Sequence, residues 1–315
     1  MFATTDDYGY SNQIWMLDMQ VGKYALRRAH HVWGPLDATY RSTRMGPGCT
    51  RGSCFDSIRN VLWTSGGNGW SGVGTTHLQA YDVATDRFST CAPAGPWGDG
   101  ECGMFVHDPK NDLLVYTDGR RHKKTYIYDP KQKTWTDGGP VPLTTDETLT
   151  MFSSRIYDPE LGVVAIFPTG KDWKIGDPPP AKGANLEQLG MRTFAYDVKT
   201  RKWRDLAPKN EDKLPYCGMP GVAYDSRNRQ VLLLKSDHGD IQPLDSKVPY
   251  GTLWILDLAS NTWQEAASGP NAKLNLASMA YDPRLNLAIC RFGHKGLWVY
   301  RCKGGCPERA FDQRD

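Results

Sequence analysis

Histidine is concentrated in the irregular parts of this 315-residue sequence, where acid–base side chains are often found. Six of the seven histidines lie in or beside segments without a strand pattern: His30, His31, His77, His122, His238 and His294. A histidine or a tyrosine can remove the proton from a carbon next to a carboxylate. The candidate bases for such a reaction are His122, His238, His294 and Tyr250. The seventh histidine, His107, lies on a predicted strand next to its turn.

Arginine is the second residue type in the sequence that could do chemistry. Arg155 and Arg51 interrupt predicted strands whose other residues are mostly small or apolar. A cation in such a position must be paired or must face water. Arg155 is therefore expected either to hold a carboxylate or sulfate of a ligand or to form a structural ion pair. Removal of a proton next to a carboxylate would give an enolate, and Arg155 and Arg192 are the candidates to offset its negative charge.

Tryptophan offers flat faces that stack on sugar rings. Trp70, Trp97 and Trp173 lie in the irregular segments. Together with the three arginines, they are the candidate substrate-binding residues. The alternative is that these indoles close the segments over the core.

The cysteine spacing gives information on whether the protein lies outside the cytoplasm and on whether it binds a metal ion. Cys49 and Cys54, like Cys302 and Cys306, are close enough in the sequence to predict disulfides in an extracytoplasmic protein. The alternative is a mixture of buried thiols and one or two bridges, with Cys290 in the core. No Cys-x2-Cys or paired-histidine pattern completes a zinc site. The sequence therefore predicts no metal ligands and identifies no cofactor.

The elements that position these residues are clearest between residues 102 and 140. Four short runs rich in β-branched and aromatic residues are predicted as strands: 102–108, 112–117, 124–129 and 133–137. Asp-Pro-Lys-Asn joins the first two runs, and Asp-Pro-Lys-Gln joins the last two. Proline presets a tight turn, and the preceding Asp can accept hydrogen bonds from the turn backbone. The stretch is predicted as a four-stranded antiparallel meander.

Both turn signals recur along the chain. The first appears as FDSIRN, YDPELG, YDSRNR and YDPRLN. The second appears as YDVATD, YDVKTR and LDLASN, with a weaker LDMQVG near the start. A repeated unit of about 40 to 50 residues with four strands is typical of a propeller blade.

In these motifs the chain resembles the Kelch family. The shared features are an aromatic-Asp-Pro step, a short turn and an outer-strand tryptophan, as at Trp135, Trp203 and Trp263. The resemblance covers nearly all of the chain and implies a propeller whose outer tryptophans pack one blade on the next. Kelch propellers serve many functions, so the resemblance implies a fold more than an activity. The Gly-Gly doublet of the family is intact only at Gly66-Gly67.

We therefore predict an all-β fold with one β-propeller domain over residues 1–315. Six blade positions are favoured, the two terminal ones incomplete, and five blades are the alternative. A truncated chain that has lost upstream strands and a secretion signal would explain the incomplete first blade, as would a composite last blade. The predicted boundaries are a partial blade 1–36, full blades at about 37–100, 101–148, 149–214 and 215–274, a partial blade 275–306 and a tail 307–315.

The connections differ between the two sides of the predicted disc. One side carries only tight turns that begin with Asp-Pro or Asp-Ser. The other side carries every long connection: 28–50, 66–77, 91–102, 168–192, 207–218 and 235–251. Long loops on a rigid scaffold are where binding and catalysis usually lie. We therefore expect the functional site on the long-loop side.

Composition narrows the function further. A net charge of +3 is too small to indicate a nucleic-acid or membrane partner, and no signal peptide or apolar run of spanning length occurs. The favoured function is a carbohydrate-binding or carbohydrate-active propeller outside the cytoplasm. Its enzymatic version would be a lyase acting on a uronate polysaccharide, with a polysaccharide or oligosaccharide as the ligand. The alternative is a Kelch-type module that binds a protein partner without catalysis. A copper oxidase is a third hypothesis, and the spacing gives it no special support.

Overall fold

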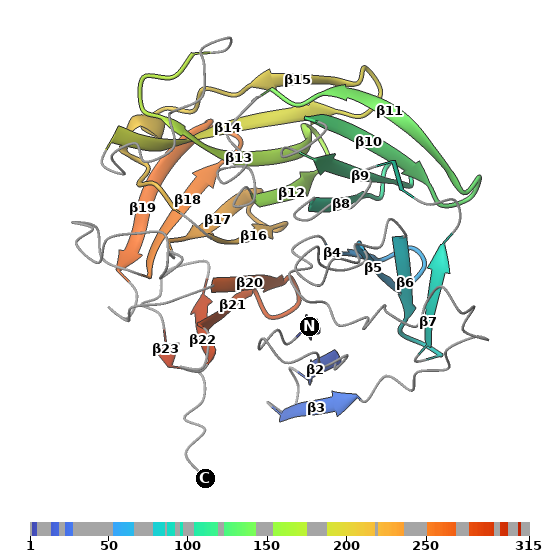
Figure 1. Cartoon of the computed structure of the whole chain (residues 1–315). Coiled ribbons are helices and arrows are strands. Elements are labelled where there is room, and N and C mark those ends of the chain that lie inside the picture. The colour runs from blue at the N-terminus through green and yellow to red at the C-terminus, as the bar shows by residue number, and fades with distance from the viewer. Residues whose placement is uncertain are drawn as a thin grey trace. The chain divides into compact units, whose positions relative to one another are not determined.

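The computed structural model forms two compact units, Met1–Val141 and Pro142–Asp315. Figure 1 labels the strands of the whole chain. The structure describes residues 2–4, 14–18, 23–27, 53–65, 78–85, 87–91, 95–96, 104–118, 123–142, 154–174, 188–217, 220–235, 251–268, 277–292, 297–301 and 308–309. Within these residues nearly all of the regular structure is antiparallel strand, and the helical part is the short 3-10 turn η4 (Glu211–Lys213). None of the described helical structure has the length and apolar character needed to cross a membrane.

The described residues of unit 1 form three antiparallel sheets. The first has the order β1-β2-β3, with β1 (Phe2–Thr4), β2 (Ile14–Asp18) and β3 (Lys23–Arg27). The second has the order β4-β5-β6-β7, with β4 (Ser53–Asp56), β5 (Val61–Ser65), β6 (Leu78–Asp82) and β7 (Arg87–Cys91). The third follows the same order, with β8 (Met104–Asp108), β9 (Leu113–Asp118), β10 (Lys124–Asp129) and β11 (Thr134–Pro140). The first strands β4 and β8 contact each other.

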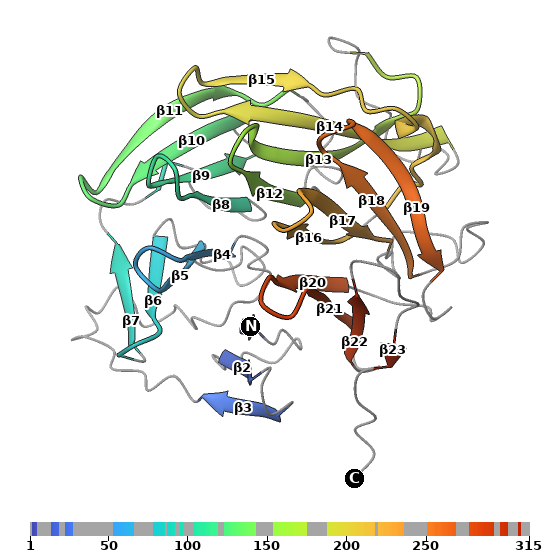
Figure 2. The same ribbon diagram turned by 180° about the vertical axis from the view of Figure 1, so that it is seen from behind.

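Unit 2 contains three further sheets, each a four-stranded meander (Figure 2). The first consists of β12 (Ser154–Asp158), β13 (Gly162–Gly170), β14 (Leu189–Asp197) and β15 (Lys202–Asp205). The second consists of β16 (Gly221–Asp225), β17 (Gln230–Leu234), β18 (Thr252–Asp257) and β19 (Thr262–Ser268). The third consists of β20 (Ala277–Asp282), β21 (Leu287–Phe292), β22 (Leu297–Arg301) and β23 (Glu308–Arg309). Strand β16 contacts β12 on one side and β20 on the other.

Meanders packed through their first strands are the arrangement of a β-propeller, so the predicted fold class is confirmed. Five of the sheets have four strands, which is the number given by the five-blade alternative. The sheet at the N-terminus has three strands and begins at a short β1, in the region predicted as a partial blade. The last sheet is more complete than predicted, because β23 supplies a fourth strand from the segment expected to be a tail.

The tight turns follow one rule, and it confirms the hydrogen bonding predicted for them. An aspartate ends the first or the third strand, and its Oδ1 accepts the backbone N–H groups two and three residues ahead at 2.8–3.3 Å. These aspartates are Asp56, Asp82, Asp108, Asp129, Asp158, Asp197, Asp225, Asp257 and Asp282. Each carboxylate thereby satisfies two donors that the turn would otherwise leave to water.

The residue four positions after each first-strand aspartate has a left-handed backbone. Asn60 and Asp112 have φ of 57°, and Gly162 has φ of 87°. A Cβ at Gly162 would collide with the backbone oxygen of Tyr196 on β14. The lack of space therefore requires glycine at position 162, and the left-handed backbone favours it.

The described apolar residues pack the sheets of each unit together. In unit 1, Trp63 of one sheet and Phe105 of the next belong to one buried cluster. In unit 2, Val164, Val231 and Trp263 belong to another, which joins the sheets β12–β15 and β16–β19. Trp263 is fully buried, and its indole Nε1 donates to Thr193 Oγ1 of the neighbouring sheet at 3.2 Å. The packing role predicted for this outer-strand tryptophan is confirmed.

Candidate functional site

Most of the residues predicted to do chemistry lie outside the described part of the chain. They are the four candidate bases His122, His238, His294 and Tyr250, and the candidate ligand-binding residues Arg51, Trp70 and Trp97. Their roles stay predictions. The structure places the remaining three candidates, Arg155, Arg192 and Trp173, all in unit 2.

Arg155 lies on the first strand β12, as predicted for an inner-strand cation. Its guanidinium carbon is 5.2 Å from the centre of the Phe167 ring on β13. A guanidinium over an aromatic face is stabilised by the ring quadrupole. The Arg155 side chain is half-buried against its own sheet, and its role in holding a ligand stays a prediction.

Arg192 lies on β14 and is held by protein groups on two sides. Its Nη1 donates to Glu211 Oε2 at 2.8 Å, and its Nη2 donates to the carbonyl oxygen of Trp173 at 2.8 Å. Glu211 is 5% exposed and also accepts the backbone N–H of Thr193 at 2.6 Å. Burial raises the pKa of Glu211, although Arg192 and Thr193 oppose that effect. A ligand carboxylate would therefore have to compete with Glu211 for the charge of Arg192.

Trp173 is 7% exposed and packs its ring edge against Phe194, with 6.4 Å between ring centres. It belongs to an apolar cluster with Phe167, which leaves little of its face for a sugar ring. Among the cysteines that the structure describes, no two are joined. Cys54 is a free thiol in the structure, so the predicted Cys49–Cys54 disulfide is not supported.

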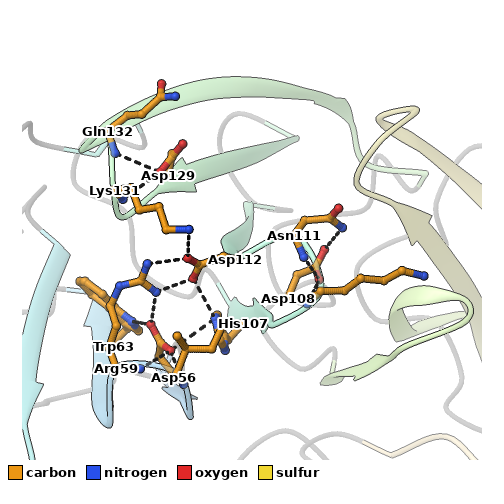
Figure 3. Close-up of polar contacts among 12 residues, drawn as sticks. Asp56, Arg59, Trp63, His107, Asp108, Asn111, Asp112, Asp129, Lys131 and Gln132 are labelled. Atoms are coloured by element: carbon orange, nitrogen blue, oxygen red, sulfur yellow. Dashed lines mark hydrogen bonds and ion pairs between the residues drawn. The ribbon is translucent and has the colours of Figure 1, made fainter.

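A polar cluster that sequence reasoning did not select lies in unit 1, where the sheets β4–β7 and β8–β11 meet (Figure 3). We call it the Asp56 joint. Its members are Asp56, Arg59, His107, Asp112 and Lys131, from the end of β4, the turn after it, strand β8, the turn after β8 and the turn after β10. The sequence pattern does not select His107, because this residue lies on a strand and not in a loop. The joint brings together residues up to 75 positions apart, which no local motif could reveal.

Asp56 is the buried centre of this joint. Beyond its two turn hydrogen bonds, its Oδ2 accepts Arg59 Nη1 at 2.8 Å and Trp63 Nε1 at 3.2 Å. Burial opposes ionisation of Asp56, but the hydrogen bonds from Arg59 and Trp63 outweigh it, so its pKa is lowered. The carboxylate is thus an anion at neutral pH with every acceptor direction in use.

Arg59 connects Asp56 to the neighbouring sheet. Its Nη1 and Nη2 donate to the two oxygens of Asp112 at 2.5 and 2.8 Å, and Lys131 Nζ lies 2.9 Å from Asp112 Oδ2 (Figure 3). The hydrogen bonds from Arg59 lower the pKa of Asp112, and Lys131 adds to the effect. A forked guanidinium–carboxylate pair of this kind fixes orientation as well as charge.

The imidazole Nε2 of His107 faces the carboxylates of the joint without a hydrogen bond to them. Its side chain is 4% exposed, and its Nε2 lies 3.4 Å from Asp56 Oδ1 and 3.8 Å from Asp112 Oδ1. Burial lowers the pKa of His107, against the opposing effect of the two carboxylates.

Unit 2 carries an equivalent joint, which shows what the arrangement does. At the Asp158 joint, the carboxylate ending β12 accepts the hydroxyl of Tyr224 at 2.7 Å and Arg229 Nε at 3.1 Å. Tyr224 precedes the next first-strand aspartate, as His107 does, and Arg229 follows it by four residues, as Asp112 does. Both joints therefore tie a buried carboxylate to the first hairpin of the following sheet.

The same comparison bears on metal binding. Asp56, His107 and Asp112 offer three ligand atoms within 4.8 Å of one another, a set that can bind a divalent cation. The two carboxylates are already balanced by the charges of Arg59 and Lys131. A divalent cation would have to displace those groups, so the geometry favours a structural joint over a metal centre.

The comparisons with known proteins agree with the fold and go no further. No family model matches the sequence, and no curated protein matches it. A similar solved structure is a structural genomics protein of unknown function from Bacteroides thetaiotaomicron VPI-5482, with a TM-score of 0.55 and 11% sequence identity. The match covers 92% of this chain and 64% of that chain, so this chain spans less than two thirds of its neighbour's length. At this identity the likeness shows the fold alone.

Proposed function

We propose that this β-propeller binds an acidic carbohydrate at the end of its sheets opposite the aspartate turns. The observation that carries the proposal is the contrast between the two ends of the sheet β12–β15. One end is closed by hydrogen-bonded turns and a joint, whereas the other extends into a long hairpin that carries exposed lysines.

The turn end offers few groups to a ligand. The turn aspartates of this sheet, Asp158 and Asp197, both bind their own backbones. The carboxylate of Asp158 is also used by Tyr224 and Arg229 of the next sheet. Polar groups that already satisfy one another have little to gain from a ligand.

The opposite end is built differently. Strands β13 and β14 have nine residues each, and their pairing continues to Gly170 and Leu189. The backbone N–H of Lys171 then bonds to Gln188 at 3.0 Å, which extends the ordered hairpin by one step. Lys171 and Lys174 are both exposed there, with the exposed Asp172 between them. A rigid hairpin is a suitable base for a binding loop.

The chemistry of that end suits a uronate ligand. Lysine ammonium groups bind carboxylates. The stacking on sugar rings predicted for the loop tryptophans would fall to Trp70 and Trp97, because Trp173 is buried. A relationship to the Kelch group, implied by the turn motifs and outer tryptophans, is compatible with this function. A lyase would further need one of His122, His238, His294 or Tyr250 as its base. Its activity would appear as absorbance of the unsaturated product.

The proposal can be tested by calorimetric titration with uronate and neutral oligosaccharides. Lys171→Ala combined with Lys174→Ala should weaken uronate binding about three- to tenfold, as expected for exposed charge pairs. The matched control replaces Lys199 and Lys202, two exposed lysines at the turn end of the same sheet. It should leave the affinity unchanged.

Two results would overturn the proposal. One is the absence of binding to every acidic glycan in a broad panel. The other is equal weakening by both pairs of substitutions, which would mean that net charge and not position decides binding. Binding without any unsaturated product would remove the lyase version and keep the binding function.

A further inference from the structure

The two joints differ in how completely their hydrogen bonds are made. At the Asp158 joint the hydroxyl of Tyr224 reaches the carboxylate at 2.7 Å. At the Asp56 joint the equivalent residue is His107, whose Nε2 lies 3.4 Å from Asp56 Oδ1 and makes no hydrogen bond. Figure 3 shows His107 beside Asp56 and Asp112. The Asp158 joint is thus held by a tyrosine hydroxyl, which does not change charge near neutral pH. The Asp56 joint instead contains an imidazole, the side chain that can change charge in that range.

The two carboxylates nearest His107 are already bound by cations when the imidazole is neutral. Asp56 faces it from β4 and Asp112 faces it from the turn after β8, and both are bound by Arg59. Lys131, from the turn after β10, adds a second positive charge on Asp112. Asp108, the next residue along β8, turns its carboxylate to its own turn backbone and to Asn111 at 2.6 Å. A proton on His107 would therefore place a further charged donor in an enclosed group whose nearest carboxylate oxygens already bind Arg59 and Lys131.

We infer that His107 makes the contact between the sheets β4–β7 and β8–β11 sensitive to protons, stable with a neutral imidazole and loosened when the imidazole is charged. The shared position of His107 and Tyr224 is the geometric basis. The fully hydrogen-bonded Asp158 joint would hold its sheets together over the same pH range.

The sign follows from linkage. Burial lowers the pKa of His107 below the value of about 6.5 that an unfolded histidine has. The unfolded chain therefore binds the proton more readily than the folded one. Stability is lost as the pH falls below about 6.5 toward the folded pKa. The folding equilibrium constant decreases in total by about a factor of ten for each unit by which the folded pKa lies below the unfolded pKa.

The test compares the urea midpoint of the wild type with that of His107→Tyr at pH 7.5 and pH 5.5. Tyrosine is the residue that the equivalent joint carries at this position, so the variant removes the group that takes up the proton. The wild type should lose more of its midpoint on acidification than the variant. In the reverse exchange, Tyr224→His should make the midpoint more sensitive to acid than it is in the wild type.

An equal change of midpoint in the wild type and His107→Tyr would overturn the inference, and so would a gain of stability by the wild type at pH 5.5. If His107→Tyr does not fold, an NMR titration of the wild type decides the question. His107→Gln then serves to assign the His107 imidazole signal. A signal that titrates below pH 6.5 supports the inference, and one that titrates above it refutes the inference.

Discussion

Replacing Asp158 by alanine should be one of the most damaging single changes at the turn end of the propeller. The carboxylate is fully buried and accepts the backbone N–H groups of Glu160 and Leu161, the hydroxyl of Tyr224 and the guanidinium of Arg229. Removing one partner of a buried charged pair typically costs about 3–5 kcal/mol. Arg229 is 26% exposed and keeps Glu160 as a partner, so the lower part of that range is expected.

The matched control is Asp197→Ala. Asp197 accepts two turn N–H groups at 2.8 and 3.0 Å, as Asp158 does, but it is exposed. Loss of two exposed turn hydrogen bonds should cost about 0.5–1.5 kcal/mol. The difference between the two variants, about 2–3 kcal/mol, isolates the contribution of the joint.

Equilibrium unfolding in urea measures both variants under the same conditions, with a variant's midpoint shift multiplied by the common slope. Equal destabilisation by Asp158→Ala and Asp197→Ala would refute the reasoning. It would mean that the turn hydrogen bonds carry the whole effect and that the contacts between sheets contribute nothing measurable.

Three further outcomes are expected. Gly162→Ala should cost at least about 1–3 kcal/mol in urea unfolding, because of its left-handed φ and the collision with the backbone of Tyr196, whereas Gly170→Ala has space and should cost less. Burial raises the pKa of Glu211, so the folded protein favours the protonated carboxyl. The stability of the wild type relative to Glu211→Gln should therefore be greatest below about pH 4.5 and should fall as the pH rises through the folded pKa. A relative stability that rises with pH would contradict the structure. Burial raises the pKa of the Cys91 thiol to about 11. Alkylation of Cys91 at pH 8, monitored by mass spectrometry, should therefore be about 100-fold slower in the folded than in the urea-unfolded protein. Comparable rates in the two states would contradict this expectation.

The turn chemistry explains why much of the fold could be predicted from the sequence. Aspartates such as Asp108 and Asp129 sit at the ends of strands because their side chains bond to the turn that follows. That interaction is local, so it leaves a local pattern. The fourth strand β23 has only two residues and no turn aspartate before it, which is why the same reasoning placed it in a tail.

The Asp56 joint could not be predicted in the same way. Its parts come from two sheets, and their pairing depends on which first strands contact each other. The residue types also differ between joints, with His107 and Asp112 in one and Tyr224 and Arg229 in the other. The usable signal is positional, since these residues lie immediately before and four residues after a first-strand aspartate.

The most direct test of the account is a double-mutant cycle between two sheets of unit 2, with Asp158→Asn, Tyr224→Phe and the double variant. Asparagine keeps an oxygen for the turn, and phenylalanine removes only the hydroxyl that reaches Asp158 at 2.7 Å. The account predicts a coupling of about 1–2 kcal/mol in the free energy of unfolding. Effects that add to within about 0.3 kcal/mol would contradict the account, because they would show that the hydroxyl of Tyr224 does not couple to the buried carboxylate of Asp158.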